Sequence, residues 1–191
     1  MNGPISPLRK AGRPTGFDRR VVLETAMDLL WDGGFEATPI GDLIDRMGLS
    51  RSSFYAAFGS KRAVLLEALD LYSQHCIRLL RDIAQSPRDA RGKLQEVVHQ
   101  IAHVDEGRGC LMVNVVTERG RHDPDVRKIA ANHHSALMGL MTAVLQDAGE
   151  PDAILRARVL ISGAYGASLM MSSGLSREEV RDLLNKLVDG N

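Results

Sequence analysis

Apolar residues recur along most of this chain at the three- and four-residue spacing of an amphipathic α-helix. The first such stripe runs from Val22 to Leu30, between a candidate N-cap at Asp18 and a stop at the paired glycines 33–34. Alternation with a period of two, which would indicate strands, does not extend over any useful length. The pattern therefore predicts an all-α protein.

Two short helices follow the first. Thr38 supplies a hydroxyl cap and Pro39 a first-turn proline for a helix that ends at Gly48. After a tight turn, Ser50 caps another short helix that ends at Gly59. A helix, a tight turn and a second helix form the plan of a DNA-binding helix-turn-helix, although purely structural helical hairpins share it.

Ser60 caps a long helix, and five more helices are expected after Ser86-Pro87, at about 88–105, 109–118, 124–148, 152–173 and 176–189. This gives about nine helices, with a capping box expected at the start of the last. We expect a basic N-terminal arm, a three-helix helix-turn-helix DNA-binding domain, and a helical signal-sensing, ligand-binding and dimerisation domain. Their ranges are 1–17, 18–64 and 65–191.

Composition and charge narrow the class of protein and the cellular compartment that we expect. The 191 residues are 44% apolar and 25% charged, as in ordinary globular proteins. Two cysteines are too few for a disulfide framework and no apolar run suits a membrane helix, so we expect a cytoplasmic protein. The net charge is zero, yet the first twenty residues set Arg9, Lys10, Arg13, Arg19 and Arg20 against Asp18. A basic N-terminal edge suits contact with phosphate, although it is also typical of a solvated tail.

The predicted helix-turn-helix carries side chains suited to DNA. Arg51, Ser52 and Ser53 begin its second helix, where such motifs place the residues that reach base edges. Thr38 at a helix N-terminus and Lys61 after the Ser60 cap are placed for phosphate contacts.

The same stretch resembles the N-terminal domain of the TetR family of transcriptional regulators. The residues that carry the resemblance are Gly12-Arg13-Pro14, Phe17, Ala26, Gly34-Phe35, Thr38, Ile44, Gly48, Ser50, Tyr55, Phe58 and Ser60-Lys61. It implies a homodimer whose recognition helices enter successive major grooves of a palindromic double-stranded DNA operator. It also implies that Thr38, Tyr55 and Lys61 hold the DNA backbone, while Arg51, Ser52 and Ser53 contribute to reading.

One departure from the family pattern shifts the expected contacts. Many members carry larger side chains just after the tyrosine, where this chain has Ala56 and Ala57. These side chains are too short to reach DNA, so we expect Arg51 to bear more of the readout and Arg13 to reach an adjacent minor groove.

The second half is expected to receive a small-molecule inducer. Candidate ligand-binding residues are Met112, Asn114, His133, Met138 and Tyr165. His133 interrupts an apolar row, which fits either a hydrogen-bonded core histidine or a group that orients a ligand. The methionines serve equally well as flexible pocket walls or as core filler.

Cys110 is a candidate redox sensor. The run from Gly109 to Asn114 resembles a short motif in one branch of the family, some members of which sense electrophiles or oxidants through cysteine. Arg108 and a helix start at Gly109 would stabilise a thiolate. The apolar residues around Cys110 favour instead a buried, inert thiol, and Cys76 falls on the core stripe of the long helix.

The last two predicted helices point to dimerisation. Small residues on the first would let another helix approach closely, and an apolar seam follows on the second. These residues are Gly163, Ala164, Gly166, Ala167 and Ser168, then Val180, Leu183, Leu184 and Leu187.

Other functions remain open at this stage. Sequence does not distinguish a repressor released by an inducer, which we favour, from an activator or a corepressed repressor. A small helical thiol enzyme would pair Cys110 with His99, His103 or His133, but nothing orients such a pair. His99 and His103 have metal-ligand spacing without a local third ligand, so we expect no metal site, no cofactor and no enzyme.

Overall fold

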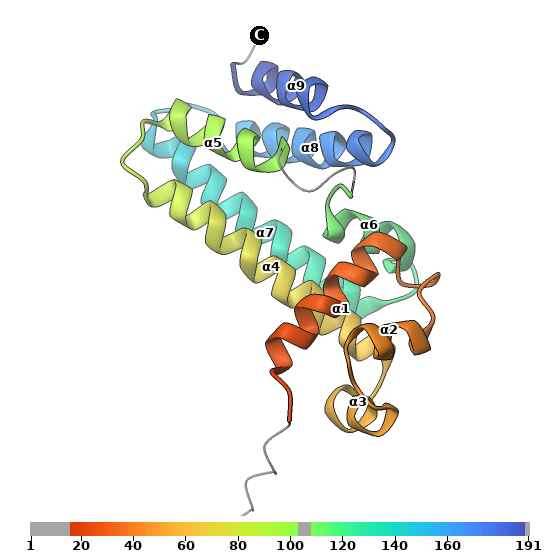
Figure 1. The fold of residues 1–191 in the computed structure, drawn as a ribbon. Coiled ribbons are helices and arrows are strands. Elements are labelled where there is room, and N and C mark those ends of the chain that lie inside the picture. Colours follow the sequence, from red (N-terminus) through yellow and green to blue (C-terminus); the bar gives the residue numbers. More distant parts are fainter. Residues whose placement is uncertain (1–15, 103–107, 190–191) are drawn as a thin grey trace, which may run out of the picture.

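The computed structural model describes residues 16–102 and 108–189, which form nine α-helices and no strands (Figure 1). The helices are α1 (Arg19–Gly33), α2 (Ile40–Arg46), α3 (Arg51–Phe58), α4 (Lys61–Gln85), α5 (Ala90–Ala102), α6 (Leu111–Arg119), α7 (Pro124–Asp147), α8 (Ala153–Ser172) and α9 (Arg177–Asp189). The predicted all-α class is confirmed. The five C-terminal helices fall within a few residues of their predicted ranges.

Most predicted helix caps form. The side chains of Asp18, Ser50 and Ser60 each accept backbone N–H groups from the first turn of α1, α3 and α4. The capping box of α9 closes in both directions between Ser176 and Glu179. These starts are local, because each joins a side chain to an N–H two or three residues away.

The predicted cap at Thr38 is wrong. Helix α2 begins at Ile40 with Pro39 as its N-cap, and no side chain caps it. The Thr38 hydroxyl instead donates to the Gly34 carbonyl at 2.7 Å, and the residue is only 4% exposed. The Gly34 carbonyl at the end of α1 therefore accepts the hydrogen bond of the hydroxyl that was expected to cap the start of α2.

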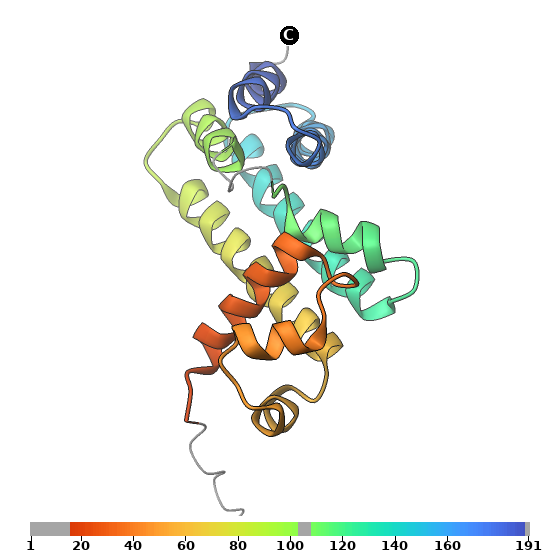
Figure 2. The same cartoon turned by 45° about the vertical axis from the view of Figure 1, so that its right-hand side comes forward.

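The helices are arranged along a central pair. Helices α4 and α7 run side by side through the molecule, with α1, α2 and α3 gathered at one end (Figures 1 and 2). Helices α5, α8 and α9 pack together at the other end, and α6 lies beside α1 near the middle. Helix α3 is thus far from α8 and α9.

The largest hydrophobic core crosses the predicted border at residues 64/65. It joins Leu30, Leu43 and Phe54 of the helix-turn-helix to Leu69 of α4 and Val115 of α6. Two smaller clusters lie among α4, α5, α7, α8 and α9. Because the first core includes α6 and the start of α7, the two halves are packed as one body there.

Within the described ranges, no helix is long and apolar enough to cross a bilayer.

Candidate functional site

Helix α3 presents one face to solvent because its other face is anchored in the core. Phe54 is fully buried. The centre of its ring lies 5.3 Å from that of Tyr55, which it meets edge to face, and 5.8 Å from that of Phe58. The residues left on the outer face are Arg51, Ser52, Tyr55 and Ala56, all of them exposed. The face predicted to read DNA is therefore accessible at one end of the molecule.

The serines at the start of α3 form a small network. The Ser50 hydroxyl caps the Ser53 N–H at 3.1 Å and lies 3.0 Å from the Ser52 hydroxyl and 2.8 Å from that of Ser53. Ser53 is half-buried, while Ser52 points outward with Arg51. Of the predicted reading residues, Ser53 is thus the most engaged within the protein. Arg13 lies outside the described residues.

Lys61 lies against the loop between α1 and α2, and Thr38 is part of that loop. Lys61 holds its ammonium 4.3 Å from the centre of the Phe35 ring. Thr38 is buried with its hydroxyl turned inward to the Gly34 carbonyl, so the hydroxyl is not placed to meet phosphate as the sequence predicted. Tyr55 keeps its ring 47% exposed.

Arg19 has a role that the sequence did not indicate. Its guanidinium lies 4.2 Å from the centre of the Phe58 ring and donates to the Ala57 carbonyl at 2.8 Å. It also pairs with Glu67 of α4 at 2.7 Å. Arg19 therefore fixes the C-terminal end of α3 instead of extending the basic arm, and only its position just inside α1 hinted at this.

Glu118, at the end of α6, clasps the loop between α1 and α2. One carboxylate oxygen accepts the N–H of Phe35 at 2.9 Å and the other that of Glu36 at 2.7 Å. Gly34, with φ of 75°, turns these successive N–H groups toward the carboxylate. This contact ties the C-terminal half to the helix-turn-helix, and nothing in the spacing of the sequence predicted it.

Replacing Glu118 with alanine is expected to speed hydrogen exchange of the Phe35 and Glu36 amides about tenfold, because hydrogen bonds to a carboxylate contribute about 1.5 kcal/mol. Amide exchange followed by NMR measures this. Glu36→Ala is the control, since it removes only the contact between Glu36 and Arg119. Unchanged exchange at Phe35 in Glu118→Ala would contradict the clasp.

Further contacts join the halves. Arg62 at the start of α4 pairs with Asp123 and Asp125 at the start of α7, each at 2.7 Å. The hydrogen bond from Arg62 lowers the pKa of the buried Asp123 carboxyl to about 2. The indole Nε1 of Trp31 donates to the Arg108 carbonyl at 3.2 Å. Together with Glu118 they link α6 and α7 to the DNA-binding end.

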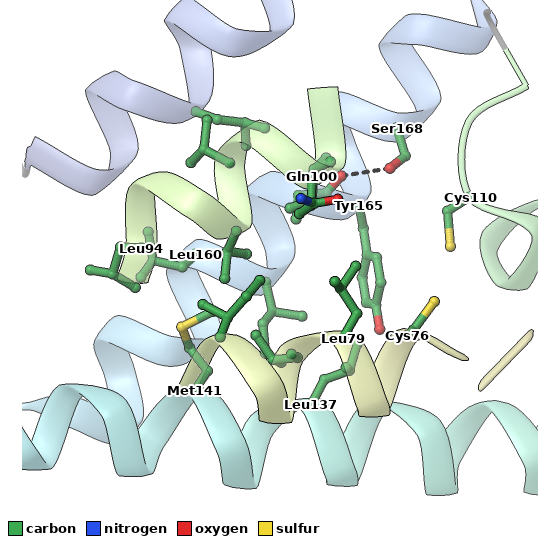
Figure 3. A pocket seen from close by; sticks show the side chains of 18 of the residues that line it. Cys76, Leu79, Leu94, Gln100, Cys110, Leu137, Met141, Leu160, Tyr165 and Ser168 are labelled. Atoms are coloured by element: carbon green, nitrogen blue, oxygen red, sulfur yellow. Dashed lines mark hydrogen bonds between the residues drawn. The ribbon is translucent and has the colours of Figure 1, made fainter. Parts of the chain in front are cut away.

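A cavity of about 180 Å³ lies in the C-terminal half, between α4, α5, α7 and α8 (Figure 3). Its walls are mostly apolar and include Leu79, Leu94, Leu137, Met141 and Leu160. Among the described residues that line it, none is charged. Such a site suits a small organic molecule.

Some of the predicted ligand-binding residues line this cavity and others do not. His133 and Tyr165 line it, whereas Met112, Asn114 and Met138 are not among its lining residues. Met112 points into the core shared with α1, Asn114 donates to the Arg108 carbonyl at 2.9 Å, and Met138 packs in the second cluster. These three side chains do not line the cavity because the orientation of each helix turns them elsewhere.

Both cysteines border the cavity. Cys110 is the N-cap of α6, and its sulfur accepts the Tyr72 hydroxyl at 3.3 Å. Burial raises the pKa of Cys76 to about 12. Arg108, expected to stabilise a Cys110 thiolate, turns to Asp28 and Asp32 of α1. In the described ranges, no cluster of three or more histidine, cysteine or acidic side chains is arranged to hold a metal ion.

Gly109 sets the entry of α6 beside the cavity. Its φ is 64°, and a Cβ at this position would lie 2.6 Å from the Ser168 carbonyl oxygen of α8. Only glycine allows both this conformation and this approach. The residue that the sequence placed as a helix start is therefore the turn before the helix, which begins at Leu111.

Large apolar side chains cover an outer face of α8. They are Ile154, Leu155, Val159, Leu169 and Met170, each at least 40% exposed. Ala167 and Ser168, expected to admit a partner helix, are buried inside the subunit, and Gly163 faces Leu187 of α9. Gly166 remains open, since an added Cβ would meet nothing within 4 Å. The face available to another molecule is thus built from larger side chains than predicted.

Residues 22–68 match the family of bacterial regulatory proteins described as the tetR family. The chain is 31% identical over 129 residues to the HTH-type transcriptional repressor BdcR of Escherichia coli, covering 67% of this chain and 66% of that protein. It is 26% identical over 121 residues to the uncharacterized HTH-type transcriptional regulator YezE of Bacillus subtilis, covering 61% of this chain. The chain spans 62% of YezE and 63% of a further relative.

The fold also matches solved structures. A cysteine mutant of the TetR family transcriptional regulator CifR, complexed with 26-base-pair operator DNA, superposes with a TM-score of 0.80 at 25% identity. The match covers 93% of this chain and 98% of that one. These proteins are described as transcriptional regulators and none as an enzyme. This chain belongs to the TetR family of bacterial regulatory proteins.

Proposed function

We propose that this protein is a transcriptional repressor that binds a palindromic DNA operator as a homodimer and is released by a small-molecule inducer. The observation that carries the proposal is the exposed outer face of α3, held by buried Phe54 and Phe58 within the segment that matches the family. The complex of CifR with operator DNA supports a DNA partner.

The DNA contacts follow from the exposure of α3 and its surroundings. Arg51 and Ser52 reach the bases from the start of α3, and Ser53 supports them through the Ser50 network. Tyr55 and Lys61 hold phosphates. Ala56 leaves a short gap in this surface, which increases the share carried by Arg51.

The homodimer forms through the apolar face of α8, with Leu183 of α9 at its edge. An apolar surface of this kind is seldom left in water, and a second copy of the chain covers it around a two-fold axis. The same axis relates the two α3 helices, as a palindromic operator requires.

Release starts at the cavity. A molecule bound between α4 and α7 changes the packing of α6, which begins at the cavity and ends at the Glu118 clasp. Movement there shifts the loop between α1 and α2 and changes the spacing of the two α3 helices. Because that spacing must match roughly 34–36 Å, a change of a few ångströms is enough for release.

Replacing Arg51 with alanine is expected to weaken binding to the promoter region of the protein's own gene by about 10- to 100-fold, because an arginine that reads a base contributes about 1–3 kcal/mol. A fluorescence-anisotropy titration with competitor DNA measures this. Arg121→Ala, in the exposed turn after α6, removes the same charge and should bind like the wild type. Equal loss in both variants, or no specific binding by the wild type, would count against the proposal.

A second candidate signal is oxidation or alkylation of Cys110. It is favoured by the position of the thiol at the N-cap of α6 and at the cavity wall. Release of DNA by hydrogen peroxide or by an electrophile should then disappear in Cys110→Ser. Equal release from both proteins would end this candidate.

A further inference from the structure

We propose that the cavity selects an uncharged, largely apolar molecule of about one substituted ring, oriented by a hydrogen-bond acceptor that meets the Tyr165 hydroxyl. The proposal rests on the proposed function, because it names the chemical class of the inducer.

The size and walls of the cavity set the first part of this class. Its volume of about 180 Å³ is comparable to the cavity of about 150 Å³ that admits benzene in an engineered protein. Leu94, Leu137, Met141 and Leu160 surround it (Figure 3). A ring with a short side chain fills such a space.

The second part of the class is that the molecule is uncharged. This follows from the absence of charge among the described lining residues. A carboxylate or an ammonium group entering this cavity would lose its water and would gain no opposite charge from the described lining residues. That desolvation costs several kcal/mol. The cavity therefore rejects the ionised form of a molecule whose neutral analogue has the same shape.

The hydrogen bonds inside the cavity set the orientation. The Tyr72 hydroxyl donates to Cys110, the Ser168 hydroxyl donates to the Ala164 carbonyl at 2.9 Å, and His133 pairs with Ser73 at 3.0 Å. These polar groups are already engaged within the protein.

Tyr165 differs from them. Within the described part of the chain its hydroxyl has no hydrogen-bond partner, and it reaches across the cavity from α8 toward Cys76 of α4 (Figure 3). Burial raises the pKa of Tyr165 to about 12, so the hydroxyl stays protonated and donates. A carbonyl or ether oxygen on the bound molecule accepts the hydrogen bond that the Tyr165 hydroxyl donates.

The thiols of Cys76 and Cys110 line this end of the cavity. The raised pKa of Cys76 keeps its thiol protonated at neutral pH. Protonated sulfur is polarizable and packs well against a ring. Packing against this wall therefore needs no covalent bond to Cys76.

Three probes of nearly the same shape test the proposal: 4-phenyl-2-butanone, 3-phenylpropanoate and butylbenzene. They carry a neutral acceptor, a negative charge and no acceptor. Titration calorimetry at pH 7.5 without DNA measures their affinities for the full-length protein. We expect the ketone to bind and the carboxylate to bind at least about a hundredfold more weakly.

Tyr165→Phe tests the orientation, with Tyr55→Phe on the exposed face of α3 as the matched control. Tyr165→Phe should weaken ketone binding about three- to tenfold and leave butylbenzene binding unchanged. Equal losses for the two probes, or a carboxylate that binds within tenfold of the ketone, would overturn the proposal. Because these titrations contain no DNA, a failure of DNA binding or of release would overturn the proposed function alone.

Discussion

Replacing Leu169 with glutamate is expected to convert the proposed homodimer into monomers and to weaken binding to the promoter fragment by at least about a hundredfold. Leu169 is 57% exposed in the single subunit and lies on the apolar face of α8. In a dimer around a two-fold axis, the new carboxylates would be buried in an apolar interface without partners. The subunit itself should keep its fold, because the side chain makes little contact within it.

The loss of DNA affinity follows from the loss of the linked second site. When one α3 is bound, the dimer holds the other beside its half-site, which raises overall affinity by about 10² to 10⁴. A monomer has only one recognition helix and its own phosphate contacts. Analytical ultracentrifugation and DNA titration with the same samples separate the two effects.

Val116→Glu is the matched control. Val116 is also an exposed apolar residue, but it belongs to α6 and is not part of the apolar face of α8. This variant should remain a dimer and bind DNA like the wild type. A dimeric Leu169→Glu protein with normal DNA affinity would show that the face of α8 is not the interface.

Features set by local spacing were predictable from the sequence. The side chains of Asp18, Ser50 and Ser60 accept N–H groups from the first turn of the helix that each one caps. The linear sequence alone was therefore enough to predict these caps. The exposed face of α3 was predictable for the same reason. Phe54 and Phe58 are four residues apart on α3 and are buried, and the exposed face is centred on the side of Ser52 and Ala56.

The cavity was not predictable in this way, because its walls come from helices far apart along the chain. Met138 was expected to line it, but the neighbouring Leu137 does so instead. One step along a helix turns the side chain by about 100°, and only the packing of α7 against α4 and α8 decides which one faces inward. Glu118 and Gly34 are likewise brought together by tertiary packing alone.

Lowering the pH from 6.5 to 4 is expected to destabilise the protein by up to roughly 3 kcal/mol through His133 alone. The side chain is 2% exposed, and its Nδ1 lies 3.0 Å from the Ser73 hydroxyl. Burial first, and then the nearby His134, lowers the pKa of His133 to about 4. The group is therefore neutral in the folded protein over most of this range.

The sign follows from the two protonation states. Above pH 6.5 His133 is neutral in both the folded and the unfolded chain, so it contributes no pH dependence. Between 6.5 and 4 the unfolded chain binds a proton that the folded protein excludes, and stability falls as the pH falls. Below about 4 both states are protonated and this contribution levels off.

Urea unfolding at a series of pH values measures the effect in the wild type, His133→Asn and His134→Asn. Asparagine at 133 has an amide to meet Ser73 but no proton to take up, so its loss of stability between pH 6.5 and 4 should be smaller by roughly 3 kcal/mol. His134 is exposed, and its replacement should leave most of the wild-type slope in place. Parallel slopes in the wild type and His133→Asn would mean that His133 is not held neutral by burial. In that case another group, not the histidine in the cavity wall, would carry the acid sensitivity of the fold.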